Sequence, residues 1–224
     1  MEWHKNSLTI VCQNVIEETP FMTKPLEGKR VAILTAHEFE DIELMYSVIQ
    51  LSQAGAHVVI GTLPQSAPGH FHGRPAWPDK PITGRFGHTI PFDVLAVGNR
   101  YSVSSIWEMN PDDFDAVVFP GGLAPDFLRI DERTLQFTAA MHRDGKVVAA
   151  ICHGPQVLIS LDRRMGTDTV RGRRIAAYCA VMDDLINAGA EYLDVPAVTD
   201  GNVVTGRVPD DLPEFCDAVI AALS

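Results

Sequence analysis

Cys152 is the residue best placed to do covalent chemistry, because it stands where an apolar strand gives way to a helix. The run Val147–Ile151 is apolar and of strand length, and a helix-like stretch begins directly after the cysteine. Small residues flank it, Ala150 two positions before and Gly154 two positions after, as a sharp strand-to-helix turn requires. The pattern predicts a nucleophile elbow whose thiol lies at a helix N-terminus, where the helix dipole favours the thiolate and lowers its pKa.

A thiol nucleophile needs a base, and His153 is the adjacent candidate. The sequence holds eight histidines, and none follows residue 153. This excludes the amidotransferase arrangement, in which a late His-x-Glu pair completes the triad after a similar cysteine elbow. We therefore expect His153 to assist Cys152, with an acidic group orienting its imidazole ring.

A double glycine predicts where a negative oxygen would be held. Gly121 and Gly122 follow the apolar strand predicted at residues 115–120. Glycines at the end of a strand allow backbone N–H groups to approach a ligand closely. With the N–H of His153, these two residues are expected to form an oxyanion hole.

Two glutamates open the first predicted helix. Glu40 and Glu43 are three positions apart and share a face of the opening turn. Acidic residues at this place also simply complement the helix dipole. Because the first strand and the elbow strand of a doubly wound sheet can lie side by side, we expect one of these carboxyls to reach Cys152. Next to a thiolate it must be protonated, since like charges raise a carboxyl pKa, and it can then donate a hydrogen bond to sulfur.

The elements that must position these residues alternate along the chain. Strands are predicted at residues 30–34, 57–61, 115–120, Val147–Ile151, 174–177 and 202–205. Helices are predicted from Asp41 to a stop at Gly55 and at Glu132–Arg143, 153–161, Met182–Ala188 and 209–223. This alternation favours a doubly wound α/β domain, in which ligands bind where strand C-termini meet helix N-termini.

Two segments depart from this rhythm. Residues 1–28 are expected to be an N-terminal extension, and residues 29–224 a single domain with an insertion at about 64–112. Prolines and glycines crowd the insertion over residues 64–87, and a hairpin-like stretch is expected at residues 88–97. His70 and His72 have the spacing of a metal pair, but no third ligand is evident, so no metal site is expected.

Composition and charge exclude several classes of protein. Apolar residues make up 46% and charged residues 21%, which is typical of a folded domain and excludes overall disorder. The formal net charge of −11 repels nucleic acid, and the basic stretch at residues 171–174 is too short to offset it. No apolar run is long enough to cross a membrane, and the N-terminus lacks a signal-peptide pattern. Four scattered cysteines without a CxxC motif favour free thiols and a cytoplasmic location.

The glutamate-rich helix opening, the double glycine and the Cys-His elbow, in this order, resemble the ThiJ/PfpI superfamily. That superfamily includes intracellular proteases, glutathione-independent glyoxalases and deglycases, and its PfpI branch is the most similar. The stretches at residues 183–189 and 200–207 also match, so the resemblance spans residues 29–222. It implies a flavodoxin-like, mostly parallel sheet sandwiched by helices, of the class I glutamine-amidotransferase-like type.

The resemblance also implies roles for single residues. Cys152 is the implied nucleophile and His153 its neighbour, while Glu43 is a buried carboxyl that contacts the thiol, with Glu40 close by. Asp126 stands where the family usually has a glutamate that completes the triad from the neighbouring subunit.

Tyr178 matches a pocket tyrosine of the PfpI branch, although a half-buried core tyrosine is an equal interpretation. The resemblance further implies a homodimer or a higher homo-oligomer in which Asp126 crosses an interface.

These observations predict a cysteine-dependent enzyme that acts on small carbonyl or amide substrates through a Cys152 thiohemiacetal or thioester. No cofactor is expected, since no glycine-rich phosphate loop follows any predicted strand. Glyoxalase-like or deglycase-like hydration and hydrolysis of a peptide share the same first step, so an intracellular cysteine peptidase stays open. Two further alternatives are a redox-sensing, chaperone-like stress protein that oxidises Cys152 and a specialised hydratase or lyase of a biosynthetic pathway.

Overall fold

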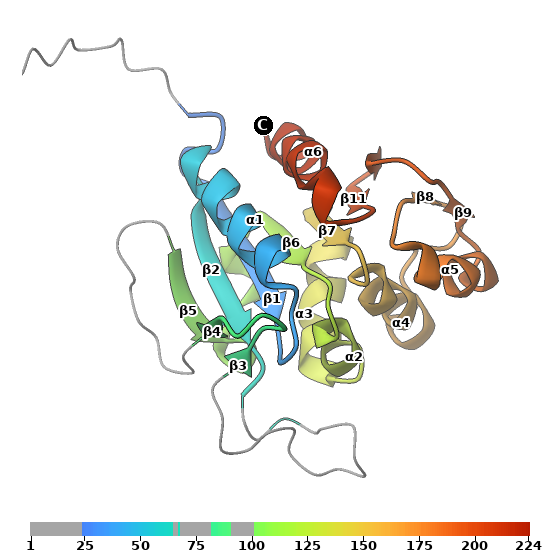
Figure 1. The fold of residues 1–224 in the computed structure, drawn as a ribbon, viewed down its shortest axis with the longest axis horizontal. Coiled ribbons are helices and arrows are strands. Elements are labelled where there is room, and N and C mark those ends of the chain that lie inside the picture. Colours follow the sequence, from blue (N-terminus) through green and yellow to red (C-terminus); the bar gives the residue numbers. More distant parts are fainter. Residues whose placement is uncertain (1–23, 65–66, 68–81, 91–100) are drawn as a thin grey trace, which may run out of the picture.

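A central sheet of seven strands organises the chain. The computed structural model describes residues 24–64, 67, 82–90 and 101–224. The strands of the sheet are β1 (Arg30–Thr35), β2 (His57–Thr62), β5 (Tyr101–Ser105), β6 (Ala116–Phe119), β7 (Val147–Ile151), β10 (Ala197–Asp200) and β11 (Val203–Gly206). Their order across the sheet is β10-β11-β7-β6-β1-β2-β5 (Figure 1). Two short pairs form separate sheets, β3 (Ile82–Thr83) with β4 (Thr89–Ile90) and β8 (Arg174–Ile175) with β9 (Glu191–Tyr192).

The middle strands are apolar along their whole length because both faces of the sheet are covered. Every residue of β6 and β7 is buried, and in β1 and β2 only the first residue is exposed. All strand pairs of this sheet are parallel except β10 with β11, which are antiparallel.

Helices cover both faces of the sheet (Figure 1). They are α1 (Asp41–Gln53), α2 (Ala124–Leu128), α3 (Glu132–Arg143), α4 (Pro155–Met165), α5 (Met182–Ala188) and α6 (Leu212–Leu223). Helix α1 packs against α6, whereas α4 packs against α2, α3 and α5. The core therefore has three layers, with the sheet between two groups of helices.

From β1 the chain adds strands first toward one edge of the sheet and then toward the other. β2 pairs with one edge of β1 and β6 with the other, so the chain winds outward to β5 on one side and to β7 and β11 on the other. Such a reversal leaves a crevice at the carboxyl ends of the strands, where ligands bind in open α/β sheets. The predicted fold class, a flavodoxin-like, mostly parallel sheet of the class I glutamine-amidotransferase-like type, is confirmed.

The sequence predicted most elements but missed the two edges of the sheet. Helices α3 and α5 have the predicted bounds. β5 lies within the proposed insertion, and only one of its five residues is buried, so it gives no apolar run. β10 is likewise a half-exposed edge strand. The strand predicted at residues 174–177 is the two-residue β8, outside the main sheet.

The hairpin expected at residues 88–97 lies mostly outside the described part of the chain, which leaves out residues 91–97. The antiparallel pair that the structure does describe is earlier, between β3 and β4, with Ile82 paired to Ile90. Of the proposed N-terminal extension, residues 1–23 are outside the described part, as are His70 and His72.

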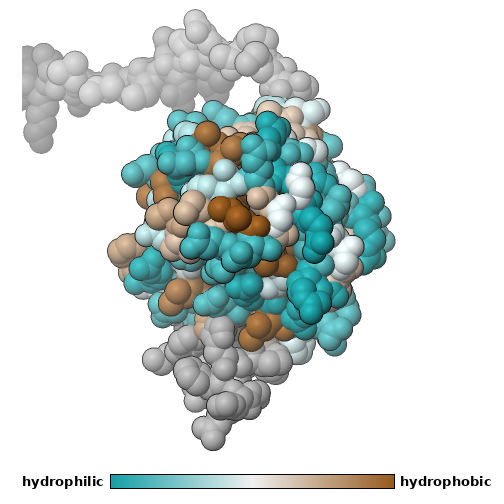
Figure 2. All heavy atoms as spheres, turned by 90° about the vertical axis from the view of Figure 1, so that its right-hand side faces the viewer, coloured by the Kyte–Doolittle hydropathy of each residue, from teal (hydrophilic) through white to brown (hydrophobic). Residues whose placement is uncertain are grey.

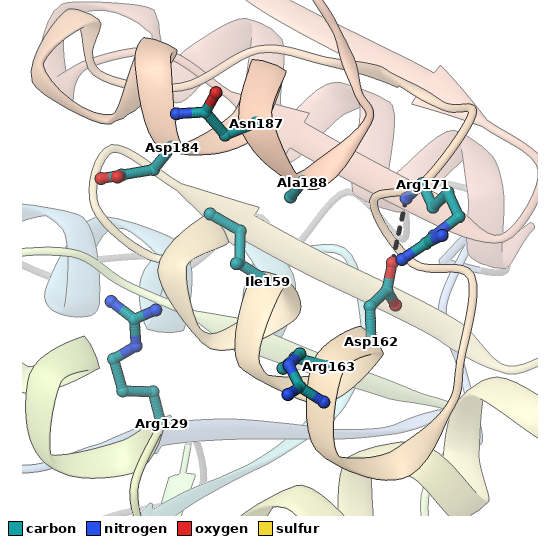
Figure 3. Close-up of a pocket in the computed structure, with 8 residues that line it drawn as sticks. All are labelled: Arg129, Ile159, Asp162, Arg163, Arg171, Asp184, Asn187 and Ala188. Carbon is teal, nitrogen blue, oxygen red and sulfur yellow. Dashed lines mark hydrogen bonds between the residues drawn. The ribbon is translucent and has the colours of Figure 1, made fainter.

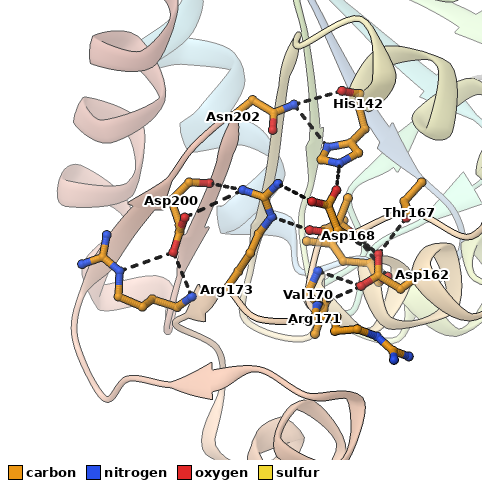
Figure 4. Close-up of polar contacts among 12 residues, drawn as sticks. His142, Asp162, Thr167, Asp168, Val170, Arg171, Arg173, Asp200 and Asn202 are labelled. Carbon is orange, nitrogen blue, oxygen red and sulfur yellow. Dashed lines mark hydrogen bonds and ion pairs between the residues drawn. The ribbon is translucent and has the colours of Figure 1, made fainter.

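A polar network fastens the β10–β11 turn to the end of α3 (Figure 4). His142 Nε2 lies 2.7 Å from an oxygen of Asp168, and Asn202 Nδ2 lies 3.2 Å from the other ring nitrogen of His142. Arg173 bonds to both Asp168 and the carbonyl of Asp200. These contacts hold β11 beside β7, the strand that carries Cys152.

The surface is mostly hydrophilic on the face that carries α4 and α5, where apolar residues form small, separate patches (Figure 2). Within the described ranges, no helix is both long and apolar enough to span a bilayer.

Candidate active site

Cys152 forms the predicted elbow directly after β7. Its φ of 60° lies in the left-handed region that residues other than glycine seldom adopt. Two backbone hydrogen bonds hold this conformation, from Cys152 N–H to the carbonyl of Gly206 at 3.1 Å and from Tyr178 N–H to the carbonyl of Cys152 at 3.1 Å. A side chain at Gly154 would clash with the carbonyl of Phe119, so the bend requires glycine there.

The sulfur of Cys152 lies at the bottom of the site, where the residue is 8% exposed. His153 Nδ1 is 3.4 Å from Sγ. The backbone N–H groups of His153 and Gly122 lower the pKa of this thiol, whereas the Glu43 carboxyl raises it, so all three groups lie close enough to act on the sulfur. Four groups therefore surround this sulfur: two from His153 after β7, one from Gly122 after β6 and the carboxyl of Glu43 in α1.

Glu43 is the buried carboxyl of the site. Its side chain is fully buried, and Oε2 accepts a hydrogen bond from Gly121 N–H at 2.6 Å. Burial raises the pKa of Glu43 to about 7, although the hydrogen bond from Gly121 opposes this shift. Near neutral pH the protonated carboxyl is therefore well populated.

The predicted lowering of the Cys152 pKa is wrong, because burial raises the pKa of this thiol above its ordinary value. The charge of the Glu43 carboxylate raises the pKa of the thiol further. The backbone amides of His153 and Gly122 lower it, but by less than burial and Glu43 raise it. A thiolate at Cys152 is therefore favoured only while Glu43 is protonated, because a carboxylic acid places no like charge beside the sulfur. Reactivity at sulfur depends on which group holds the proton.

Gly121 has a different role from the predicted one. Its N–H already donates to Glu43 Oε2, so it is not available to an oxyanion, and the expected oxyanion hole stays a prediction for the N–H groups of Gly122 and His153. A Cβ at Gly121 would lie 2.9 Å from Cys152 Cβ, from Glu43 Oε2 and from His153 N. Glycine is needed here because the ends of β6 and β7 and the start of α1 meet in this space.

The first strand and the elbow strand were expected to lie side by side, but β6 lies between β1 and β7. Glu43 reaches the site because the β1–α1 connection crosses the end of β6. Phe39 pairs with Gly122 in an antiparallel bridge, and Glu40 N–H donates to the carbonyl of Gly121 at 3.2 Å. The two connections thus hold both glutamates beside the double glycine.

His153 and its surroundings complete the site. Burial lowers the pKa of His153, whereas the charge of Asp126, on α2 of the same chain, raises it. No hydrogen bond between Asp126 and His153 occurs in the described part of the chain, and supply of Asp126 across an interface stays a prediction. The Tyr178 ring lies 5.0 Å from the His153 ring, and this tyrosine is 37% exposed, at the mouth of the site.

Sequence reasoning missed Arg85, in the turn between β3 and β4. Its Nη1 lies 3.1 Å from Oε2 of Glu40, which is buried, so Arg85 forms one wall of the site. The glycines on either side predict a turn, but nothing in the sequence indicates which part of the molecule that turn contacts.

Other places in the structure lack this convergence. Where the chain is described, no group of three metal-ligating side chains is found. A hollow of about 340 Å³ lies between α4 and α5 (Figure 3), away from Cys152. It contains none of the predicted site residues and is lined by Arg129, Ile159, Asp162, Arg163, Arg171, Asp184, Asn187 and Ala188.

The sheet is doubly wound, and a cysteine lies at a strained bend directly after one of its inner parallel strands. These two features place the chain in the amidotransferase-like class of α/β proteins. Within that class, the model of the DJ-1/PfpI family matches residues 29–222, and the chain belongs to this family. The resemblance seen in the sequence is confirmed.

Three similar proteins give the range of names in the family. A deglycase of Pyrococcus abyssi is 39% identical over 183 residues, which are 82% of this chain and 92% of that protein. A putative cysteine protease of Bacillus subtilis, YraA, is 38% identical over 188 residues, 84% of this chain and 94% of its own length. A crystal structure from Anabaena variabilis, with a DJ-1/ThiJ/PfpI-like and a ferritin-like domain, has a TM-score of 0.69 and 35% identity, covering 87% of this chain and 48% of that one.

Proposed function

We propose that the chain is a cysteine-dependent enzyme that acts on small carbonyl or amide compounds, with glyoxalase-like or deglycase-like chemistry as its main activity. The observation that carries this proposal is the convergence of His153 Nδ1, Glu43 and the N–H groups of His153 and Gly122 on the sulfur of Cys152. The relatives named as deglycases and as a putative cysteine protease support an enzyme of this kind.

In the reactive arrangement the proton rests on Glu43, and Cys152 is a thiolate. The sulfur attacks the carbonyl carbon, an S–C bond forms, and the carbonyl electron pair moves to oxygen. The N–H groups of Gly122 and His153 stabilise that oxygen. Burial lowers the pKa of His153, so its neutral ring can accept a proton near pH 7 and return it later.

For a 2-oxoaldehyde the first product is a thiohemiacetal at Cys152. The overall reaction adds one water molecule and gives a 2-hydroxy acid, so neither an oxidant nor a reductant is consumed. When the aldehyde carbon already carries an amine, the same addition of water releases that amine and the same acid, which is deglycation.

Peptide hydrolysis is the second candidate, because a relative of nearly the same length is named a putative cysteine protease. Attack of Cys152 on an amide carbonyl would release the amine and leave a thioester, which water then hydrolyses. Asp126 would orient His153 in both reactions.

The test is a set of three assays, with methylglyoxal, with a methylglyoxal-modified arginine derivative and with a fluorogenic peptide. We expect turnover of at least one substrate by the wild type and none by Cys152→Ala. Cys216→Ala is the matched control, since Cys216 is also buried but lies against Ser47, outside the site. Full activity of Cys152→Ala would refute the proposal. Absence of all turnover, with one equivalent of peroxide consumed at Cys152, would favour the redox-sensing alternative.

A further inference from the structure

The turn that carries Arg85 is fixed against the β1–α1 connection (Figure 1). Arg85 N–H donates to the carbonyl of Phe39 at 3.0 Å. The Asp41 carboxylate accepts from Phe86 N–H at 2.9 Å and from His88 N–H at 2.8 Å. The first residue of α1 therefore holds the turn in place, and the backbone of Arg85 has a defined position relative to the site.

The side chain of Arg85 is held on one side only. Its Nη1 bonds to the buried Glu40, but the side chain is 50% exposed. In the described part of the chain, none of its other N–H donors has a protein partner. A guanidinium has five such donors in one plane, and their spacing matches the two oxygens of a carboxylate.

The charge of Arg85 reaches the reacting groups. Burial is the main cause of the raised pKa of Glu43 and of the lowered pKa of His153, and the Arg85 charge makes both pKa values lower than they would be without it. Glu40 and Asp126, the other charged groups that act on these two residues, are both acidic. In a chain with a net charge of −11, an anionic substrate would be repelled unless a cation stood at the site.

We infer that Arg85 is a specificity-determining residue that binds an anionic group of the substrate, a carboxylate, beside the carbonyl that Cys152 attacks. Glu40 keeps the guanidinium on the site side of the turn and leaves its free edge toward the substrate. That the bound anion is part of a substrate rests on the proposed function. The attraction of Arg85 for an anion is a property of the site and can be measured without turnover.

The experiment compares two reagents that alkylate the same sulfur, iodoacetate and iodoacetamide. Both lose iodide and form an S–C bond with Cys152, and they differ in whether a carboxylate or a neutral amide sits next to the reacting carbon. The fraction of thiolate affects both rates equally. The ratio of the two rate constants therefore isolates the attraction of Arg85 for the anion from its effect on neighbouring pKa values.

We expect Arg85→Gln to lower the iodoacetate-to-iodoacetamide ratio at Cys152 by about fivefold, the effect of one partly exposed ion pair. Arg85→Lys keeps the charge and should retain part of the preference, while Glu40→Gln should raise the ratio. The matched control is Arg174→Gln, because Arg174 is 51% exposed and is likewise paired with one aspartate, Asp200. Rates are read by mass spectrometry of the peptide that contains Cys152, on variants whose thermal unfolding is cooperative.

A ratio unchanged in Arg85→Gln, or changed as much in Arg174→Gln, would overturn the inference, even if the enzyme turns over methylglyoxal. A lowered ratio would support it even if no assayed substrate reacts, in which case the proposed function alone fails. If the proposed function holds, glyoxylate, whose aldehyde Cys152 can add to reversibly but cannot convert to a 2-hydroxy acid, should inhibit methylglyoxal turnover less strongly in Arg85→Gln than in the wild type.

Discussion

At the scale of single residues, the proposed chemistry depends on whether Glu43 holds a proton beside Cys152. Both groups are buried, and Gly121 N–H donates to the Glu43 carboxyl at 2.6 Å, which holds that carboxyl at the elbow. The pKa of Glu43 is raised to about 7, so this carboxyl titrates near neutral pH, whereas burial and the Glu43 charge raise the pKa of the Cys152 thiol well above its ordinary value. A histidine base in contact with the sulfur then matters less for removing the thiol proton than for handling the proton of the substrate oxygen.

Glu43→Leu tests where that proton lies. If the protonated carboxyl donates to a thiolate, loss of the donor should slow alkylation of Cys152 by iodoacetamide at pH 7 by roughly tenfold, since one pKa unit is a factor of ten. The isosteric Glu43→Gln keeps a hydrogen-bond donor and should react more like the wild type. Faster alkylation of Glu43→Leu would mean that the carboxylate, not the acid, faces the sulfur.

The stability of the fold should also depend on Glu43 as the pH changes. Its folded-state pKa of about 7 is above the ordinary 4.5. The protonated carboxyl therefore contributes its full stabilisation below pH 4.5, and this contribution is lost as the pH rises through 7. In a Cys152→Ala background, we expect Glu43→Gln to gain about 3 kcal/mol at most over Glu43 between pH 5 and pH 8. Urea unfolding at several pH values measures this gain, and parallel stability curves would contradict it.

At the scale of elements, four connections build the site: β1–α1, β6–α2, β7–α4 and the β3–β4 turn. The two described residues other than glycine with positive φ, Glu38 and Cys152, both lie in these connections. Strained backbone of this kind persists only where the surroundings fix it. Here the Phe39–Gly122 bridge and the hydrogen bond from Cys152 N–H to Gly206 do so.

Gly121→Ala tests the close approach of these connections. The added Cβ would sit 2.9 Å from Cys152 Cβ and from Glu43 Oε2, so the carboxyl and the elbow must move apart. We expect turnover to fall by about a hundredfold, as a small misplacement of reacting groups can cause, while cooperative unfolding is kept. Gly166→Ala is the control for a general loss of stability, since the φ of 68° at the end of α4 strains an added Cβ although nothing lies within 4 Å of it. Equal activity of Gly121→Ala and the wild type would show that the site tolerates the wider spacing.

The sequence predicted the elements that are apolar or well capped, such as β7 and α3, because burial leaves a clear pattern. It missed β5 and β10 because edge strands bury few side chains. At the site, the types and places of Cys152 and His153 could be read from local spacing. The wall formed by Arg85 could not, because no local pattern reports contacts between residues 45 positions apart.

At the scale of the whole molecule, the open question is how many copies of the chain make one active unit. Two isoleucines of α1, Ile42 and Ile49, are 53% and 42% exposed and lie seven positions apart on the same helix face. Leu123, next to the double glycine, is 50% exposed. Exposed apolar groups beside a site favour a contact with a second copy.

We expect sedimentation to show a homodimer or a higher homo-oligomer at micromolar concentration. Ile49→Glu should shift it toward monomer, because burial of a carboxylate in an apolar contact is unfavourable. Ile186→Glu on α5 is the control, with 52% exposure at a different face. A wild-type monomer would remove the interface from the mechanism and leave Asp126 to act on His153 within its own chain.

The depth of the Cys152 sulfur also has a practical use. Cys179, one residue beyond Tyr178, is exposed, whereas Cys152 is nearly covered. A bulky maleimide should therefore label Cys179 and not Cys152, whereas a small electrophile such as iodoacetamide should react with both. In a Cys12→Ser background, labelling in that order would let a fluorophore at position 179 report on occupancy of the site without blocking the nucleophile.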